Sequence, residues 1–252
     1  MNTKRTPSRL REDHENAFTR IELLALLIVL ALLASIALPA IGISASSSRF
    51  VQCLNNLRLV GRAVHGWGSN YQNDPPWVAY VSDGGTRPEG SGTKPGNAWF
   101  EFTALSNELV TPRILACPAD SEARVASEFS VSANGGYMAT GYRGLATSYF
   151  INLHTSFNPG GTAALRGNPR APLCGDRNVF FPSVASCALG IAAVDSIPIN
   201  DPSLRWTNAV HGVQGNLLLF DGSVAPTTSE DLRKAFRSSG GDNSTWHLLR
   251  AR

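Results

Sequence analysis

The chain has 252 residues, with 22 Lys and Arg against 19 Asp and Glu, which gives a formal net charge of +3. Charged residues make up 16% of the chain and hydrophobic residues 43%, which is typical of a folded domain and excludes a disordered chain. No stripe of Lys and Arg interleaved with aromatic residues occurs, so nucleic acid is not an expected partner.

The N-terminal segment divides at Phe18 into a charged leader, residues 1–17, and an apolar segment, residues 18–43. Leu23 to Ile43 contain no charged side chain. As a helix this run is about 30 Å long, the thickness of the hydrocarbon core of a bilayer. It predicts a single transmembrane helix, and the basic leader predicts a cytoplasmic N-terminus with the rest of the chain on the periplasmic side of the inner membrane.

The start of this segment carries a processing pattern. Ala17 precedes Phe18, and Glu22 is the fifth residue counted from Phe18. These residues resemble the class III signal of type IV prepilins and of the pseudopilins of type II secretion. The resemblance implies cleavage between Ala17 and Phe18 by a prepilin peptidase, methylation of the new amino terminus, and pairing of Glu22 with the amino terminus of a neighbouring subunit. A plain signal anchor with an accidental Glu22 is the alternative.

Residues 44–68 predict an amphipathic continuation of the helix to about Gly66. Apolar residues recur at intervals of three and four positions, with polar residues between them. The apolar positions are Phe50, Cys53, Leu54, Leu57, Val60, Val64 and Trp67. This stretch is expected to cover one face of a sheet.

Residues 69–252 predict one extracytoplasmic, β-rich globular domain with long loops. Short apolar runs alternate with Gly, Pro, Asn and Asp. We expect a short helix over Trp99 to Leu109, a strand over Ser148 to Leu153, and a late helix capped by Thr228 or Ser229. The expected fold is therefore α+β and pilin-like: a long N-terminal helix, transmembrane then amphipathic, packed on an antiparallel β-sheet.

Four cysteines lie in the region that this topology places outside the membrane, where disulfides can form. Sequence alone leaves three pairings open. We favour Cys53 with Cys117, which would join the helix to the globular domain, and Cys174 with Cys187, which would close a short loop.

The segment from His211 to Gly222 is the most informative part of the outer domain. A strand over Leu217 to Phe220, a turn at Asp221-Gly222 and a return strand are expected. The pattern of a His, nine further residues and then Asp-Gly resembles the C-terminal motif of a family of pilin-like proteins with a prepilin leader. That family is abundant in planctomycetes, and its domain is one of unknown function. Four further stretches match the pattern of that family: residues 53–58, 114–120, 148–152 and 175–178.

The chemistry of this motif admits two interpretations. His211 and Asp221 are expected to approach one another, so that the carboxylate fixes the tautomer of the imidazole, a structural role. The alternative is a divalent cation site drawn from Asp120, Asp176 and Asp221, because pseudopilins commonly hold calcium in an outer loop. The sequence has no dense Asp-rich calcium loop. No cofactor is expected other than this possible structural calcium ion.

No catalytic motif is present, so an enzyme is not expected. The predicted function is that of a structural pseudopilin-like subunit, which assembles with other pilin-like subunits on an assembly platform into a type II secretion or type IV pilus-like filament. The alternative is a monomeric, membrane-tethered protein that binds a glycan or protein ligand, with Trp77 and Trp246 as the expected exposed contacts.

Overall fold

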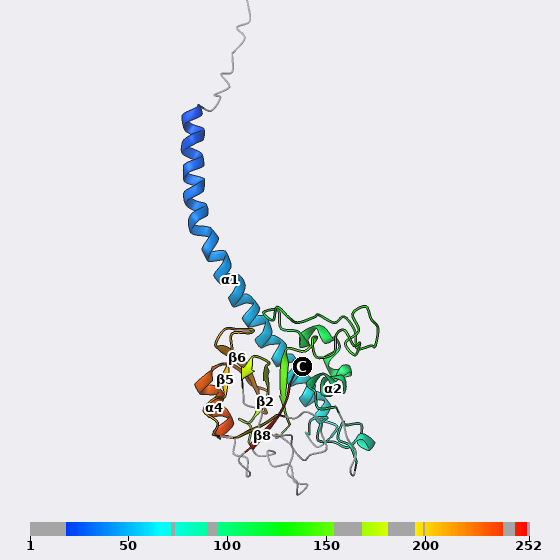
Figure 1. Ribbon diagram of the computed structural model, residues 1–252. Helices are drawn as coiled ribbons and strands as arrows, with labels where there is room; N and C mark the ends of the chain where they lie inside the picture. Colours follow the sequence, from blue (N-terminus) through cyan, green and yellow to red (C-terminus); the bar gives the residue numbers. More distant parts are fainter. Residues whose placement is uncertain are drawn as a thin grey trace, which may run out of the picture. The chain divides into compact units, whose positions relative to one another are not determined.

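The computed structural model describes residues 19–71, 74–89, 95–153, 168–180, 195–198, 200–238 and 245–250. The chain forms two compact units, residues 1–45 and residues 46–252. Helix α1 (Arg20–Gly68) contributes residues to both (Figure 1).

The first unit contains the beginning of α1, which starts with a capping box. The Glu22 carboxylate accepts hydrogen bonds from the backbone N–H and the hydroxyl of Thr19, both at 2.8 Å, and the Thr19 hydroxyl accepts from the Glu22 N–H at 3.3 Å. These bonds lower the pKa of Glu22. The large apolar side chains that follow, from Ile21 to Leu33, are 49% to 78% exposed.

The prediction of a long N-terminal helix with a transmembrane first half over residues 18–43 is wrong. Among the residues that the structure describes, no helix is long and apolar enough to cross a membrane. The predicted single-pass placement in the inner membrane is wrong for the same reason.

The second unit is built on a six-stranded sheet in the order β4-β8-β1-β2-β6-β7, in which all pairs are antiparallel. The strands are β1 (Tyr149–Asn152), β2 (Pro172–Asp176), β4 (Asp195–Pro198), β6 (Gln214–Leu219), β7 (Val224–Thr228) and β8 (Thr245–Leu249). A small second sheet pairs β3 (Val179–Phe180) with β5 (Arg205–Trp206). The predicted α+β class with an antiparallel sheet is confirmed.

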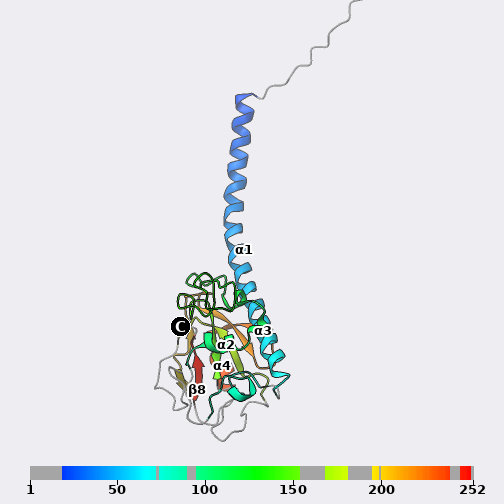
Figure 2. The ribbon, with the colours of Figure 1, turned by 90° about the vertical axis from the view of Figure 1, so that its right-hand side faces the viewer.

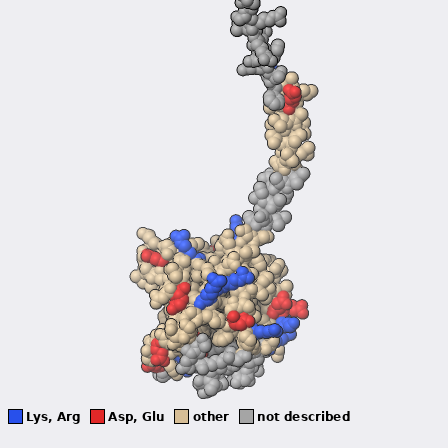
Figure 3. All heavy atoms as spheres, turned by 180° about the vertical axis from the view of Figure 1, so that it is seen from behind, with Lys and Arg blue, Asp and Glu red and all other residues tan. Residues whose placement is uncertain are grey.

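Both faces of the large sheet are covered. Alternate side chains of a strand point to opposite faces, and in β1 Tyr149 and Ile151 join one core while Phe150 joins the other. The first core is closed by the part of α1 that follows residue 46, and the second by helix α4 (Ser229–Ser238), which Figure 1 draws on the opposite side. Charged side chains of both signs are mixed over the face in Figure 3.

The predicted amphipathic stretch covers the sheet as expected. Cys53, Leu57 and Val60 are fully buried, whereas Val51 and Leu59 on the other side of the helix are 52% and 40% exposed. The apolar positions therefore recur with the helical period and meet the sheet along one stripe.

Several local predictions match the structure, with different boundaries. The predicted helix over Trp99 to Leu109 is two short helices, α2 (Ala98–Thr103) and α3 (Ser106–Leu109), which Figure 2 places beside each other. Two 3-10 turns, Val81–Asp83 and Pro112–Leu115, complete the helical elements of the described residues.

The aromatic residues expected to be exposed are not. Trp77 is 3% exposed and Trp246 is fully buried, where its ring meets the ring of Phe236 edge-on at 5.3 Å. Trp77 stands beside Pro75-Pro76 and Trp246 in a polar tail, and these positions suggested exposure. Trp246 instead lies in β8, which is the second strand from one edge of the sheet and is paired on both sides. Tertiary packing decided both positions.

Candidate functional site: a disulfide, a histidine and a buried carboxylate

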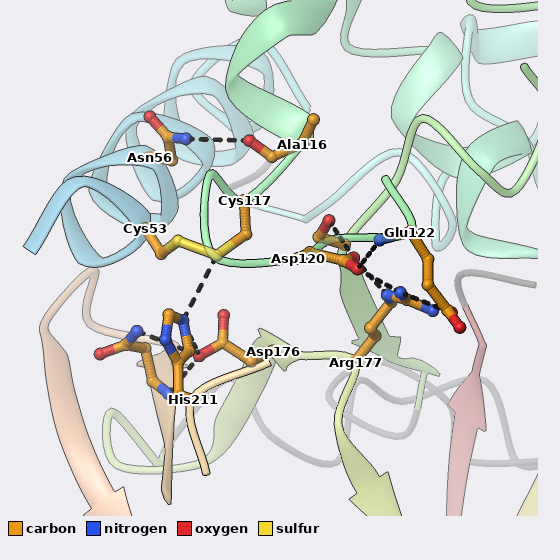
Figure 4. Close-up of a disulfide and its surroundings, with 11 residues drawn as sticks. Cys53, Asn56, Ala116, Cys117, Asp120, Glu122, Asp176, Arg177 and His211 are labelled. Carbon is orange, nitrogen blue, oxygen red and sulfur yellow. Dashed lines mark hydrogen bonds and ion pairs between the residues drawn. A yellow bond between two sulfur atoms is a disulfide. The ribbon is translucent and has the colours of Figure 1, made fainter. Parts of the chain in front are cut away.

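A disulfide joins Cys53 of α1 to Cys117, which follows the 3-10 turn at residues 112–115. This is the first of the two favoured pairs. Both cysteines are buried, and the Asn56 side chain donates to the carbonyl of Ala116 at 3.4 Å beside them (Figure 4). Cys174 is a free, buried thiol. Its predicted partner, Cys187, lies outside the described residues.

His211 lies between this disulfide and Asp176 (Figure 4). Its Nε2 is 3.3 Å from the Cys117 sulfur and 3.4 Å from Asp176 Oδ2, and its side chain is 3% exposed. The ring of Phe50 meets the imidazole edge-on at 4.8 Å. Burial lowers the pKa of His211 to about 4, so the imidazole is neutral at neutral pH.

Asp176 ends β2 and is fully buried. Its Oδ2 accepts from the backbone N–H of Asn216 at 2.6 Å and from the Asn216 amide at 3.0 Å, whereas Oδ1 has no partner among the described residues. Burial raises the pKa of Asp176 to about 7, and the nearby charge of Asp120 adds to this. The short contact of Asp176 with His211 is therefore not a full ion pair.

Next to this site, the charges of Asp120, Arg177 and Glu122 are paired with one another. Arg177 binds both carboxylate oxygens of Asp120 through Nε and Nη2, and Nη2 also donates to Glu122 at 3.2 Å. The Ser148 hydroxyl donates to Asp120 at 2.7 Å. Burial alone would raise the pKa of Asp120, but the bonds from Arg177 and Ser148, with the charge of Arg177, outweigh it and lower the pKa.

The loop that carries His211 is tied down by a residue that the sequence analysis did not single out. The Asn178 amide donates to the carbonyl of Thr207 at 2.8 Å and to that of Gln214 at 2.9 Å. These two carbonyls flank His211 in the chain, so Asn178 fixes the loop on both sides of the imidazole. The only signal for Asn178 in the sequence was its place in residues 175–178, one of the stretches named for the resemblance.

The predicted pairing of His211 with Asp221 is wrong. His211 precedes β6, whereas Asp221 follows it, so the two residues lie at opposite ends of the strand. The Asp221 carboxylate instead accepts from the N–H of Ser223 at 2.8 Å, and Gly222 has φ +82°, a left-handed conformation that favours glycine. The Asp-Gly pair therefore forms the turn, as its sequence indicated.

The three carboxylates considered for a cation site lie in two places. Asp120 and Asp176 are near His211, and Asp221 is at the other end of β6.

The processing residues Ala17 and Phe18 lie outside the described residues, whereas Glu22 caps α1. The sequence pattern Thr-x-x-Glu, here Thr19 to Glu22, is typical of such a capping box at the start of a helix.

A cavity of about 520 Å³ opens beside His211. Arg49, Phe50 and Gln214 also line it. Asp176 Oδ2 and the Cys117 sulfur both face the same ring nitrogen of His211, Nε2, whereas a catalytic triad uses the two nitrogens separately. The Cys117 sulfur is also bonded to Cys53 and offers no nucleophile in this state.

Comparison with known proteins adds no relative, because no family model, no curated protein and no solved structure matches this chain.

Proposed function

We propose that this chain is a pilin-like structural subunit, processed before Phe18 and assembled into a type II secretion or type IV pilus-like filament. Assembly proceeds by packing of the apolar beginning of α1 against copies of itself or of related subunits. The observation that carries the proposal is the exposure of every large apolar side chain from Ile21 to Leu33.

A helix that is apolar on all sides requires a partner on all sides. Burial of an apolar side chain stabilises by roughly 1.5–3 kcal/mol, so leaving some ten of them in water is strongly unfavourable. Leu24 is 59% exposed and Leu30 51%, and these two side chains are six positions apart on the helix. A bundle of like helices covers such a surface from several directions, as a filament core does.

Glu22 supports this proposal in a second way. The carboxylate already caps the helix through Thr19, and cleavage before Phe18 would place a new ammonium group one residue before that cap. In an apolar bundle this charge favours pairing with an ammonium group, its own or that of a neighbour.

The test is site-specific photocross-linking in cells that express the full chain. A photoreactive residue replaces Leu27, which is 55% exposed, and in a matched variant it replaces Val131, which is 73% exposed in the second unit. We expect a ladder of adducts containing this chain from position 27 and none from position 131. Absence of the ladder from position 27, or an equal ladder from both positions, would contradict the proposal.

The variant Glu22→Gln separates the two roles of the carboxylate. Glutamine can still accept from Thr19 in a capping box, but it carries no charge. We expect Glu22→Gln to reduce the ladder from position 27 strongly. An unchanged ladder would show that the charge is not used in assembly.

No observation favours the glycan-binding alternative, because the aromatic residues expected to make exposed contacts, Trp77 and Trp246, are buried.

A further inference from the structure

We propose that reduction of the Cys53–Cys117 disulfide creates a binding site for a zinc-like divalent cation, with Cys53, Cys117, His211 and Asp176 as its ligands. The same two segments, α1 and the loop after residue 115, would then be joined by a disulfide in the oxidised state and by a cation in the reduced state. The proposal concerns the second unit alone and does not depend on filament assembly.

The spacing of the ligand atoms carries this proposal. The two sulfurs and a ring nitrogen of His211 all lie within 4.8 Å of one another. In a tetrahedral zinc site with bonds of about 2.0–2.3 Å, neighbouring ligand atoms are roughly 3.3–3.8 Å apart. His211 Nε2 is already 3.3 Å from the Cys117 sulfur. The two sulfurs, now covalently bonded, must move apart to make room for the cation.

Asp176 is the ligand proposed for the fourth position, and because it is not one of the three groups within 4.8 Å of one another, it must shift toward the sulfurs to bind. Its Oδ2 is 3.4 Å from His211 Nε2, which is again the separation of neighbouring ligands around zinc. The carboxylate is fully buried and its Oδ1 has no partner among the described residues, an unusual state for a buried polar atom. A cation bound through both carboxylate oxygens of Asp176 would give Oδ1 the partner that it lacks among the described residues.

The surroundings hold these ligands in place. Asn216 donates twice to Asp176 Oδ2, and Phe50 packs edge-on against His211. Groups of this kind orient the ligands of metal sites and restrict their rotation. The cavity lined by His211, Phe50 and Gln214 gives the cation a route to the site.

The chemistry favours zinc over calcium. Two thiolates and an imidazole are ligands for zinc and similar ions, whereas calcium takes six to eight oxygens. A dithiol reductant passes two electrons and two protons to the disulfide, so that its sulfur–sulfur bond breaks and the reductant becomes a disulfide itself. Binding of the cation then releases the two thiol protons.

The experiment measures zinc binding to the full chain before and after reduction by a phosphine, which does not compete for zinc as a dithiol does. After removal of unbound metal, we expect one zinc per reduced chain and none per oxidised chain. Cobalt substituted for zinc should give the absorption of thiolate-to-cobalt charge transfer, which reports sulfur ligands directly. Zinc should also raise the melting temperature of the reduced chain, because it binds the folded state.

The variants His211→Gln and Asp176→Asn test the two ligands that are not cysteines. We expect each to weaken zinc binding at least about tenfold. The matched control is His65→Gln, because His65 lies on α1 and its ring contacts the Gly61 carbonyl of its own helix and the ring of Phe220, away from the proposed ligands. Each variant is first shown to be folded in the oxidised state by circular dichroism, where the disulfide is intact.

Two results would overturn the proposal. One is a reduced wild-type chain that retains no zinc. The other is equal zinc affinity of wild type and His211→Gln, which would mean that the two thiols bind the metal without the rest of the site.

Discussion

Two stretches of one helix, α1, differ in a way that composition alone would not suggest. Residues 21–33 are almost entirely apolar, and all their large side chains are exposed; Leu27, for example, is 55% exposed. Residues 50–67 contain many polar side chains, yet Leu57 is fully buried. An apolar residue is buried only where a partner surface exists, and within the second unit the sheet supplies that surface for residues 50–67.

The largest expected effect in this comparison comes from the disulfide that fixes the second stretch. The bond between Cys53 and Cys117 closes a separation of 64 residues, for which the chain-entropy model gives about 4 kcal/mol of stabilisation. We expect the double variant Cys53→Ala, Cys117→Ala to lower the free energy of unfolding by about that amount in urea. Reduction should destabilise wild type under metal-free conditions but leave the double variant unchanged.

A leucine from each stretch gives the direct comparison. Leu57→Ala removes a fully buried side chain and should cost about 3 kcal/mol through lost burial and the cavity left behind. Leu27→Ala should change the unfolding of the second unit by less than about 0.5 kcal/mol. Equal effects in urea titration would show that residues 21–33 also pack within the same chain.

The ion pair beside the disulfide should give a pH-dependent effect. The lowered pKa of Asp120 lies below its unfolded value of about 3.9, so the ionised carboxylate stabilises the fold above that pH, and this contribution is lost as the pH falls through the folded pKa. We expect Asp120→Asn to cost about 2 kcal/mol at pH 7, since Arg177 retains Glu122. The difference from wild type should shrink below about pH 4 in thermal melts.

A capping residue away from the site should give a smaller effect than the ion pair. At the start of α4 the Asp231 carboxylate accepts from the hydroxyl of Thr228 at 2.7 Å, and the Thr228 hydroxyl accepts from the Asp231 N–H at 3.2 Å. Thr228→Ala removes this capping box and should cost about 1 kcal/mol. Thr228→Ser, which keeps the hydroxyl, should restore most of it.

Helix faces, turns and helix caps were predictable from the sequence, because each depends on residues that are close together in the chain. The period of the apolar residues in 50–67 gave the buried face of α1, Asp221-Gly222 gave the turn between β6 and β7, and Thr228 gave the cap of α4. The pair Cys53 and Cys117 was favoured because it would join the helix to the globular domain, and the structure has this disulfide.

What the tertiary structure alone decided is which distant residues meet. His211 lies against Asp176 and Cys117, which come from other elements, whereas its sequence neighbour in the motif, Asp221, lies beyond the far end of β6. Sequence spacing does not predict such contacts, because the order of strands β2 and β6 in the sheet sets them. The same holds for Trp246, which its neighbours in the sheet bury, and for the exposure of the apolar side chains from Ile21 to Leu33, which the sequence does not determine.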